Sequence, residues 1–243
     1  MKNIAFFFTS LILFISCDDN SIPPVSVKLE PFIIENYSAD ARQLYFNEVF
    51  KNPNNPDHNN PELNVDEERK VLEIIQAVYN LQSLERDTVF NIYKIHGYYC
   101  YNFNSIYLKV NTALPAIRKL AEGIIPTGDA ELDKVLTKYK PESVKPFYGY
   151  PEFPWLTITT KKEYNMIPVE AEFRRLKSVL TAEFNNGCVG GGNTIDLERK
   201  GNTATIIFSI GEGDCPAGCI YHRYWKFEVT NGMARFMNSY SNY

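Results

Sequence analysis

The stretch that decides the fold is residues 194–240, TIDLERKGNTATIIFSIGEGDCPAGCIYHRYWKFEVTNGMARFMNSY. It contains short runs that alternate between apolar and polar residues and are rich in β-branched and aromatic side chains, which is typical of strands. Lys200-Gly201-Asn202 and Asn231-Gly232 have the composition of hairpin turns. The stretch therefore predicts a four-stranded antiparallel meander. Its expected strands are Thr194–Arg199, Thr203–Ile210, Ile220–Val229 and Met233–Tyr240.

A helix is expected immediately before this meander. Pro168 suits the first position of a helix. The spacing of apolar residues from Phe173 to Phe184 predicts that the helix continues to Phe184 with one buried face. A C-terminal helix followed by antiparallel strands indicates the α+β class, with helices packed on antiparallel sheets.

The rest of the chain mixes helical and strand patterns. Helices are expected at Asp40–Phe50, from an N-cap at Asn64 to Leu81, at Ala113–Glu122 and at Asp129–Tyr139. Strands are expected at Thr88–Ile95, Ser105–Asn111 and Trp155–Thr160, with an early one near Ile33. Prolines at 141, 146, 151 and 154 favour a linker. We therefore expect an N-terminal α+β subdomain at residues 32–150 and a C-terminal one at 151–243.

The N-terminal residues have the layout of a secretory signal. Lys2 is followed by an apolar run at residues 4–15, which is shorter than the ~20 residues that span a bilayer. The sequence Phe14-Ile15-Ser16-Cys17 resembles the lipobox of bacterial lipoproteins. The resemblance implies that residues 1–16 are a signal peptide and that Cys17 becomes a lipidated N-terminus. The alternative is an ordinary cleaved signal in which Cys17 falls by chance.

Residues 17–31 are expected to be an acidic, proline-containing tether that lifts a folded domain from the membrane. Asp18-Asp19 resembles the export signal of surface lipoproteins in the Bacteroidetes group, which implies a lipid anchor in the outer membrane and exposure at the cell surface. In enteric bacteria, an aspartate after the cysteine instead implies retention in the inner membrane.

Size and charge exclude some classes of partner. The mature chain of about 227 residues is long enough to bury a real core. Its formal net charge is −4 for the full sequence, and no block of Lys and Arg appears. A nucleic-acid partner is therefore not expected.

Cys100, Cys188, Cys215 and Cys219 remain once Cys17 is set aside. An even number of cysteines in an exported chain favours disulfides, and four cysteines allow three connectivities. The Pro-Ala-Gly segment between Cys215 and Cys219 can form a tight turn, which favours that bridge. Cys100–Cys188 is then the remaining pair.

The loop Gly211–Cys219 and the strand after it form the densest group of chemically interesting residues. The favoured interpretation is a β-loop clamped by a disulfide. A second interpretation is a metal site that uses Asp214, Cys215, Cys219 and His222, but this spacing is not a standard zinc signature. A third is a redox-active dithiol, which normally uses Cys-x-x-Cys at a helix start.

His222 belongs to the more polar face of its strand, because Trp225, Phe227 and Val229 on the other face read as core. It is a candidate ligand-binding residue, with Asp214 or Glu212 as its expected neighbour. A solvated strand histidine is the plainer interpretation. No catalytic triad, metal or cofactor motif is present, so no catalytic residue is assigned.

The motif Gly213–Cys219, GDCPAGC, followed by Trp225–Val229 resembles a family of uncharacterised exported or lipid-anchored bacterial proteins. That family has no assigned reaction. The sequence thus favours a lipid-anchored protein with a non-enzymatic role, either binding a protein, peptide or glycan or supporting envelope structure. The alternative is a small hydrolase or metal-dependent enzyme centred on Asp214, Cys215, Cys219 and His222.

Overall fold

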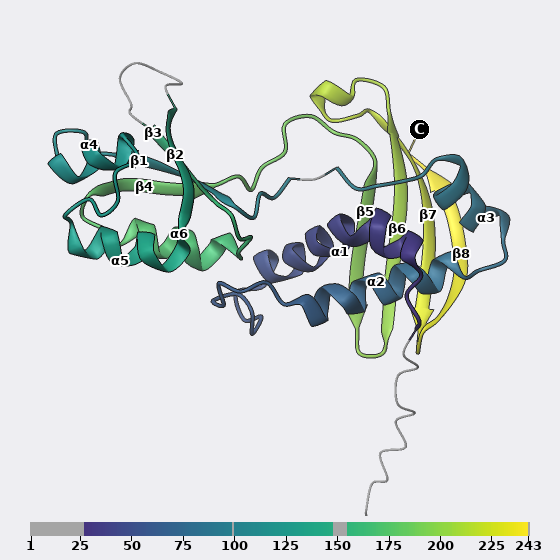
Figure 1. Cartoon of the computed structure of the whole chain (residues 1–243). Coiled ribbons are helices and arrows are strands. Elements are labelled where there is room, and N and C mark those ends of the chain that lie inside the picture. The colour runs from purple at the N-terminus through teal and green to yellow at the C-terminus, as the bar shows by residue number, and fades with distance from the viewer. Residues whose placement is uncertain (1–26, 99, 148–154, 243) are drawn as a thin grey trace, which may run out of the picture.

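The computed structural model describes residues 27–98, 100–147 and 155–242, which form two lobes (Figure 1). In the first lobe, helices α1 (Pro31–Lys51) and α2 (Val65–Tyr79) cover one face of a four-stranded sheet. The strands of this sheet, in order, are β5 (Thr194–Lys200), β6 (Thr203–Glu212), β7 (Tyr221–Thr230) and β8 (Met233–Ser241). All three pairings are antiparallel. The predicted meander and the α+β class are therefore confirmed.

Alternation of side chains decides which face of this sheet the helices cover. Residues such as Phe208, Trp225 and Phe227 are buried against α1 and α2 in the first hydrophobic core, as predicted for the last two. Their neighbours along the strands point to the opposite face, which we call the outer face because no helix packs on it in the described part of the chain. One-sided burial of this kind is common in antiparallel sheets.

The second lobe contains another antiparallel sheet and its own core. Its strand order is β2 (Pro141–Phe147), β3 (Trp155–Thr160), β1 (Ser105–Val110) and β4 (Val179–Phe184). Its helices are α4 (Pro115–Ala121), α5 (Ala130–Tyr139) and α6 (Met166–Arg174). The predicted strands at 105–111 and 155–160 are confirmed, and Ile106, Leu108 and Val110 are buried as expected.

Side-chain caps set several helix starts. The Asn64 side chain accepts a hydrogen bond from the Glu67 amide, and the Asp129 side chain accepts two from the first turn of α5. Both caps agree with the sequence analysis. Helix α1 begins earlier than predicted, at Pro31, so Ile33 is helical rather than part of a strand.

Three segments differ from prediction. Residues 88–95 do not form a strand: Ser83 caps the short helix α3 (Leu84–Asp87), which continues into the π-helix η1 (Thr88–Ile92). The helix predicted from Pro168 to Phe184 instead begins at Met166 and ends at Arg174, and the chain returns as β4 to pair with β1. Residues 141–147 form β2 instead of a linker, because they pair with β3.

The two cores do not follow the expected boundary near residue 150. The first core combines residues from 33–95 with residues from 195–229, whereas the second is built from Phe46 and residues 103–184. The second lobe is thus inserted within the first. Residues 1–26 lie outside the described residues, and with them the expected signal peptide, Cys17 and most of the tether.

Two segments, 96–104 and 185–193, connect the lobes and are tied together. The Tyr98 amide donates a hydrogen bond to the Asn193 carbonyl at 2.9 Å, and the Asn102 amide donates to Asn185 at 3.2 Å. A disulfide between Cys100 and Cys188 joins the same segments. The pairing left by elimination in the sequence analysis is therefore the one observed.

One buried amide organises the loop between α1 and α2. The Asn165 side chain is almost fully buried, and its nitrogen donates hydrogen bonds to the carbonyls of Asp57 (2.8 Å) and Asn60 (2.9 Å). Its oxygen accepts from the Ile167 amide at 3.0 Å and so caps α6. The loop of the first lobe is thereby fixed to a helix of the second.

We expect Asn165→Asp to lower the free energy of unfolding by about 1–3 kcal/mol, because a carboxylate cannot donate to the Asp57 and Asn60 carbonyls and places buried acceptor oxygens against them. Asn59→Asp is the control, since Asn59 is exposed in the same loop. Urea unfolding of both variants measures the difference. Equal stability of the two variants would contradict this role for Asn165.

Candidate functional site

Both disulfides lie near one end of the sheet of the first lobe. We call this the loop end, made of residues 211–220 between β6 and β7 together with residues 186–193. The turn end is opposite, at the hairpin turns 201–202 and 231–232 (Figure 1). Strand β6 has ten residues, so the two ends are about 30 Å apart.

The loop 211–220 is closed by a disulfide between Cys215 and Cys219, as favoured from the sequence. Cys215 begins a single 3₁₀ turn, η2 (Cys215–Ala217), and the Asp214 carbonyl accepts from the Ala217 and Cys219 amides, both at 3.1 Å. The Ile220 amide donates to the Glu212 carbonyl at 3.0 Å. The loop is therefore held by backbone bonds as well as by its bridge.

The second loop packs directly on the first. The Gly191 amide donates to the Cys215 carbonyl at 2.6 Å. A side-chain carbon at position 191 would lie 2.6 Å from the Gly218 carbonyl carbon, which is too close for any residue except glycine. The Tyr98 hydroxyl donates to the Val189 carbonyl at 2.8 Å and adds a third segment. The two loops, each of which contains a disulfide-bonded cysteine, thus form one continuous surface.

His222 lies on the outer face beside this loop, as predicted, but its partner is different. Its Nδ1 atom is 3.2 Å from the hydroxyl of Ser209, which is fully buried. The sequence analysis expected Asp214 or Glu212 there. Both of those residues are exposed, and the structure pairs His222 with Ser209 on the neighbouring strand instead.

Ser209 continues to two further polar residues. Its hydroxyl is 2.8 Å from the Thr194 hydroxyl, which donates to Asp196 Oδ2 at 3.2 Å. We call His222, Ser209, Thr194 and Asp196 the outer-face chain. Sequence reasoning missed the last three members, although register counted from the 201–202 turn places Thr194 directly opposite Ser209.

The outer-face chain fixes the proton positions of its members. An ionised carboxylate only accepts hydrogen bonds, so Thr194 donates to Asp196. Ser209 must then donate to Thr194, which leaves Ser209 to accept from His222. A neutral His222 consequently carries its proton on Nδ1, and its Nε2 lone pair is available to accept a proton or a hydrogen bond.

Tyrosines extend this surface away from His222. The rings of His222 and Tyr224 stack with centroids 5.7 Å apart, and Tyr224 stacks on Tyr240 of β8 at 4.7 Å. Partial burial raises the pKa of Tyr224, and the nearby Tyr240 and Asp196 raise it further. The Tyr224 hydroxyl therefore stays protonated at neutral pH and can donate a hydrogen bond.

A metal site here would need the thiolates of Cys215 and Cys219 as ligands. Neither thiolate is present, because the two cysteines are bonded to each other. Within the described residues, no group of three or more His, Cys, Asp and Glu side chains is arranged to hold a metal ion. The residues that the structure brings together at the loop end are His222, the Cys215–Cys219 bridge and the outer-face chain.

A cleft of about 240 Å³ lies where α1 approaches the start of β5, and Thr194 and Asp196 line it. Asp40 lies on its α1 side. This carboxylate is 1% exposed and accepts from the Gly97 amide (2.7 Å) and from His96 Nδ1 (2.8 Å). Asp40 thus holds the first connecting segment against α1, and the sequence alone did not indicate this pair.

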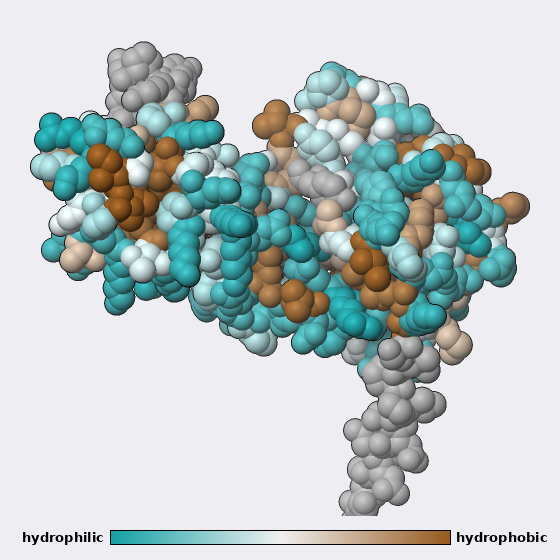
Figure 2. Space-filling model, in the orientation of Figure 1, coloured by the Kyte–Doolittle hydropathy of each residue, from teal (hydrophilic) through white to brown (hydrophobic). Residues whose placement is uncertain are grey.

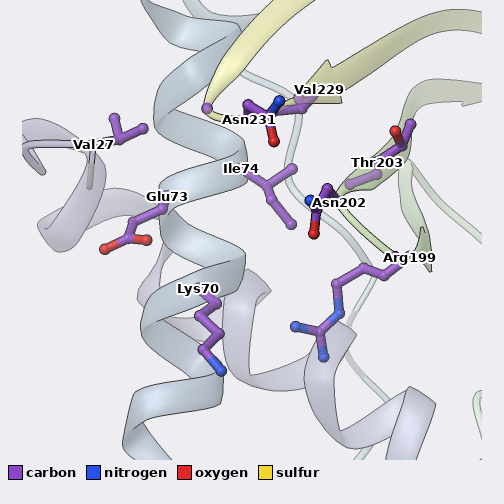
Figure 3. Close-up of a pocket in the computed structure, with 12 residues that line it drawn as sticks. Val27, Lys70, Glu73, Ile74, Arg199, Asn202, Thr203, Val229 and Asn231 are labelled. Atoms are coloured by element: carbon purple, nitrogen blue, oxygen red, sulfur yellow. The ribbon is translucent and has the colours of Figure 1, made fainter. Parts of the chain in front are cut away.

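A second cleft, of about 210 Å³, lies at the turn end beside Val27, where the described chain begins (Figure 3). Its basic residues are already paired. Arg199 contacts Glu48 (3.0 Å) and Glu67 (2.9 Å), and Lys70 contacts Glu67 at 2.5 Å. Burial alone would raise the pKa of Glu67, but its bonds to Lys70 and Arg199 lower it. This cleft therefore offers no unpaired cation to an anionic ligand.

Comparison of the chain with protein-family models, with curated proteins and with solved structures found no match. No helix in the described ranges combines the length and the hydrophobicity that a membrane span requires. The function is therefore inferred from the residues of the loop end.

Gly191→Ala is expected to lower the free energy of unfolding by about 1–3 kcal/mol, because the added carbon overlaps the Gly218 backbone. Gly187→Ala, in the same loop, has nothing within 4 Å of the added carbon and should change stability by less than ~0.5 kcal/mol. Urea unfolding gives both values. A tolerated Gly191→Ala would mean that the loops are not in contact.

Proposed function

We propose that the chain is a lipid-anchored outer-membrane protein, exposed at the cell surface, that binds a protein, peptide or glycan through its loop end. Its role is non-enzymatic. The single observation that carries the proposal is the arrangement of the first lobe. The described chain begins beside the turn end, while both disulfides, His222 and the exposed tyrosines lie toward the loop end about 30 Å away.

An anchor at Cys17 is consistent with this orientation. Val27 is ten positions after Cys17, a length of chain that reaches at most about 35 Å when extended. The turn end is then the membrane-facing side, and the loop end points outward. Two or more acyl chains suffice for stable attachment without a transmembrane helix.

The surface chemistry of the loop end supports binding. Val189 and Ile220 are 88% and 58% exposed there, close to Tyr98 and Tyr221, which also have exposed rings. On the face shown in Figure 2, hydrophilic surface is interrupted by several hydrophobic patches, one of them on the second lobe. Exposed apolar and aromatic side chains on a rigid support are favourable for recognition, because little conformational entropy is lost on binding.

The enzymatic alternative centred on Asp214, Cys215, Cys219 and His222 has less support as a hydrolase or metalloenzyme. Its two cysteines are bridged, Asp214 is exposed, and His222 is bonded to Ser209. We therefore retain the binding function as the proposal.

The anchor is tested by expressing the full chain and Cys17→Ala in a Gram-negative host supplied with labelled palmitate. We expect the parent chain to carry label, to fractionate with the outer membrane and to be digested by protease added to intact cells. Cys17→Ala should lose both the label and the membrane attachment. Recovery of the parent chain from cytosol with Met1 retained would refute the anchor.

Binding is tested with two matched surface variants of the immobilised protein. Val189→Asp places a charge at the loop end, and Met233→Asp places one at the turn end, where Met233 is 74% exposed. Ligand recovered from extracts of the envelope and culture medium should fall at least tenfold with Val189→Asp and should be unchanged with Met233→Asp. The opposite order would assign binding to the turn end.

A further inference from the structure

The Cys215–Cys219 bridge has a histidine at its side. A side-chain carbon at position 211 would lie 2.6 Å from Cys219 Sγ and 3.0 Å from His222 Cε1. Gly211 is opposite His222 in the β6–β7 pairing, so the absence of its side chain lets the sulfur and the imidazole approach each other. No residue with a Cβ atom fits this position without moving one of them.

The backbone also holds His222 in place. Its amide donates to Asn242 Oδ1 at 2.5 Å, and its carbonyl accepts from the Asn242 amide at 3.2 Å. The outer-face chain holds the ring through Nδ1 and links it to the Asp196 carboxylate through two hydroxyl groups. His222 is therefore oriented in the way that a general base requires, with one nitrogen tied and the other available.

We infer that Cys215–Cys219 is a reactive disulfide that exchanges with thiols, with His222 as the proton carrier. This exchange is a stoichiometric reaction of the bridge itself and not catalytic turnover, so it goes beyond the proposed non-enzymatic binding function and does not depend on it. The substrate class is a small or protein-borne thiol. The sequence lacks the Cys-x-x-Cys motif of such sites, and the structure supplies a histidine beside the sulfur instead.

The exchange step balances without any other oxidant. The incoming thiol transfers its proton to His222 Nε2, and the thiolate attacks Cys215 Sγ. A bond forms between the substrate sulfur and Cys215 while the Cys215–Cys219 bond breaks. The electron pair passes to Cys219 Sγ, which takes the proton from His222. A second thiol then cleaves the mixed disulfide, so two thiols are oxidised and one protein disulfide is reduced.

Cys100–Cys188 provides an internal reference in the same molecule, because it joins the connecting segments instead of lying beside His222. The purified, fully bridged protein is mixed with reduced glutathione, quenched with acid and alkylated, and each cysteine peptide is followed by mass spectrometry. We expect Cys215–Cys219 to open at least tenfold faster than Cys100–Cys188. Equal rates at the two bridges would overturn the inference.

His222→Gln should slow exchange at Cys215–Cys219 by about 10- to 100-fold and leave Cys100–Cys188 unchanged. Lys226→Gln, further along the same face of β7, is the control and should exchange at the parent rate. An unchanged rate in His222→Gln, with the thermal unfolding temperature preserved, would also overturn the proposal.

Ser209 is a positioning residue in this scheme, and it gives a second test if His222→Gln does not fold. Ser209→Ala removes the hydroxyl that accepts from His222 and should slow exchange several-fold. Ser209→Thr keeps the hydroxyl and should restore the rate to within about twofold of the parent. Equal rates in the alanine and threonine variants would show that the outer-face chain does not act on the bridge.

Discussion

Helix α1 belongs to both hydrophobic cores, and this shared membership determines how the lobes meet. Ile33, Tyr37 and Leu44 pack in the first core, whereas Phe46 packs in the second against Phe103 and Phe184. Between Tyr37 and Phe46 on the same helix, Gln43 bonds to both backbone groups of Tyr101. Because one rigid helix contributes to both cores, the two lobes have little freedom to move relative to each other. A short stretch of backbone pairing and one disulfide are then enough to fix the connecting segments.

The elements that were predicted correctly are those whose local pattern agrees with their long-range packing. The meander has strand composition, hairpin turns and a period of two, all of which favour the same answer. Residues 176–184 are different, because Leu176, Leu180 and Phe184 also fit a helical face. Only pairing with β1 selects the strand, and it leaves Leu180 62% exposed. Residues 88–92 have strand-like composition, yet the Ser83 cap commits them to a helix.

The candidate site likewise combines features that the local sequence predicts with features that depend on long-range packing. The position of His222 on the polar face follows from alternation alone, and the Cys215–Cys219 bridge follows from the short turn between the cysteines. The contact between Ser209 and Thr194 could also have been found, since a two-residue turn at 201–202 sets the register of β5 and β6. The approach of His222 and Cys219 Sγ to the same point beside Gly211 depends on the path of the loop, which no local pattern encodes.

The two disulfides differ in what their surroundings allow them to do. Cys100–Cys188 joins two segments that α1 and backbone hydrogen bonds already hold, so opening it leaves other constraints in place. Cys215–Cys219 closes a five-residue loop, for which the chain-entropy contribution to stability is small compared with a long loop. Because this bridge contributes little to stability, it can open in an exchange reaction at little cost to the fold. The bridge lies beside an oriented imidazole at the end of the sheet opposite the hairpin turns, and both of its cysteines are partly exposed.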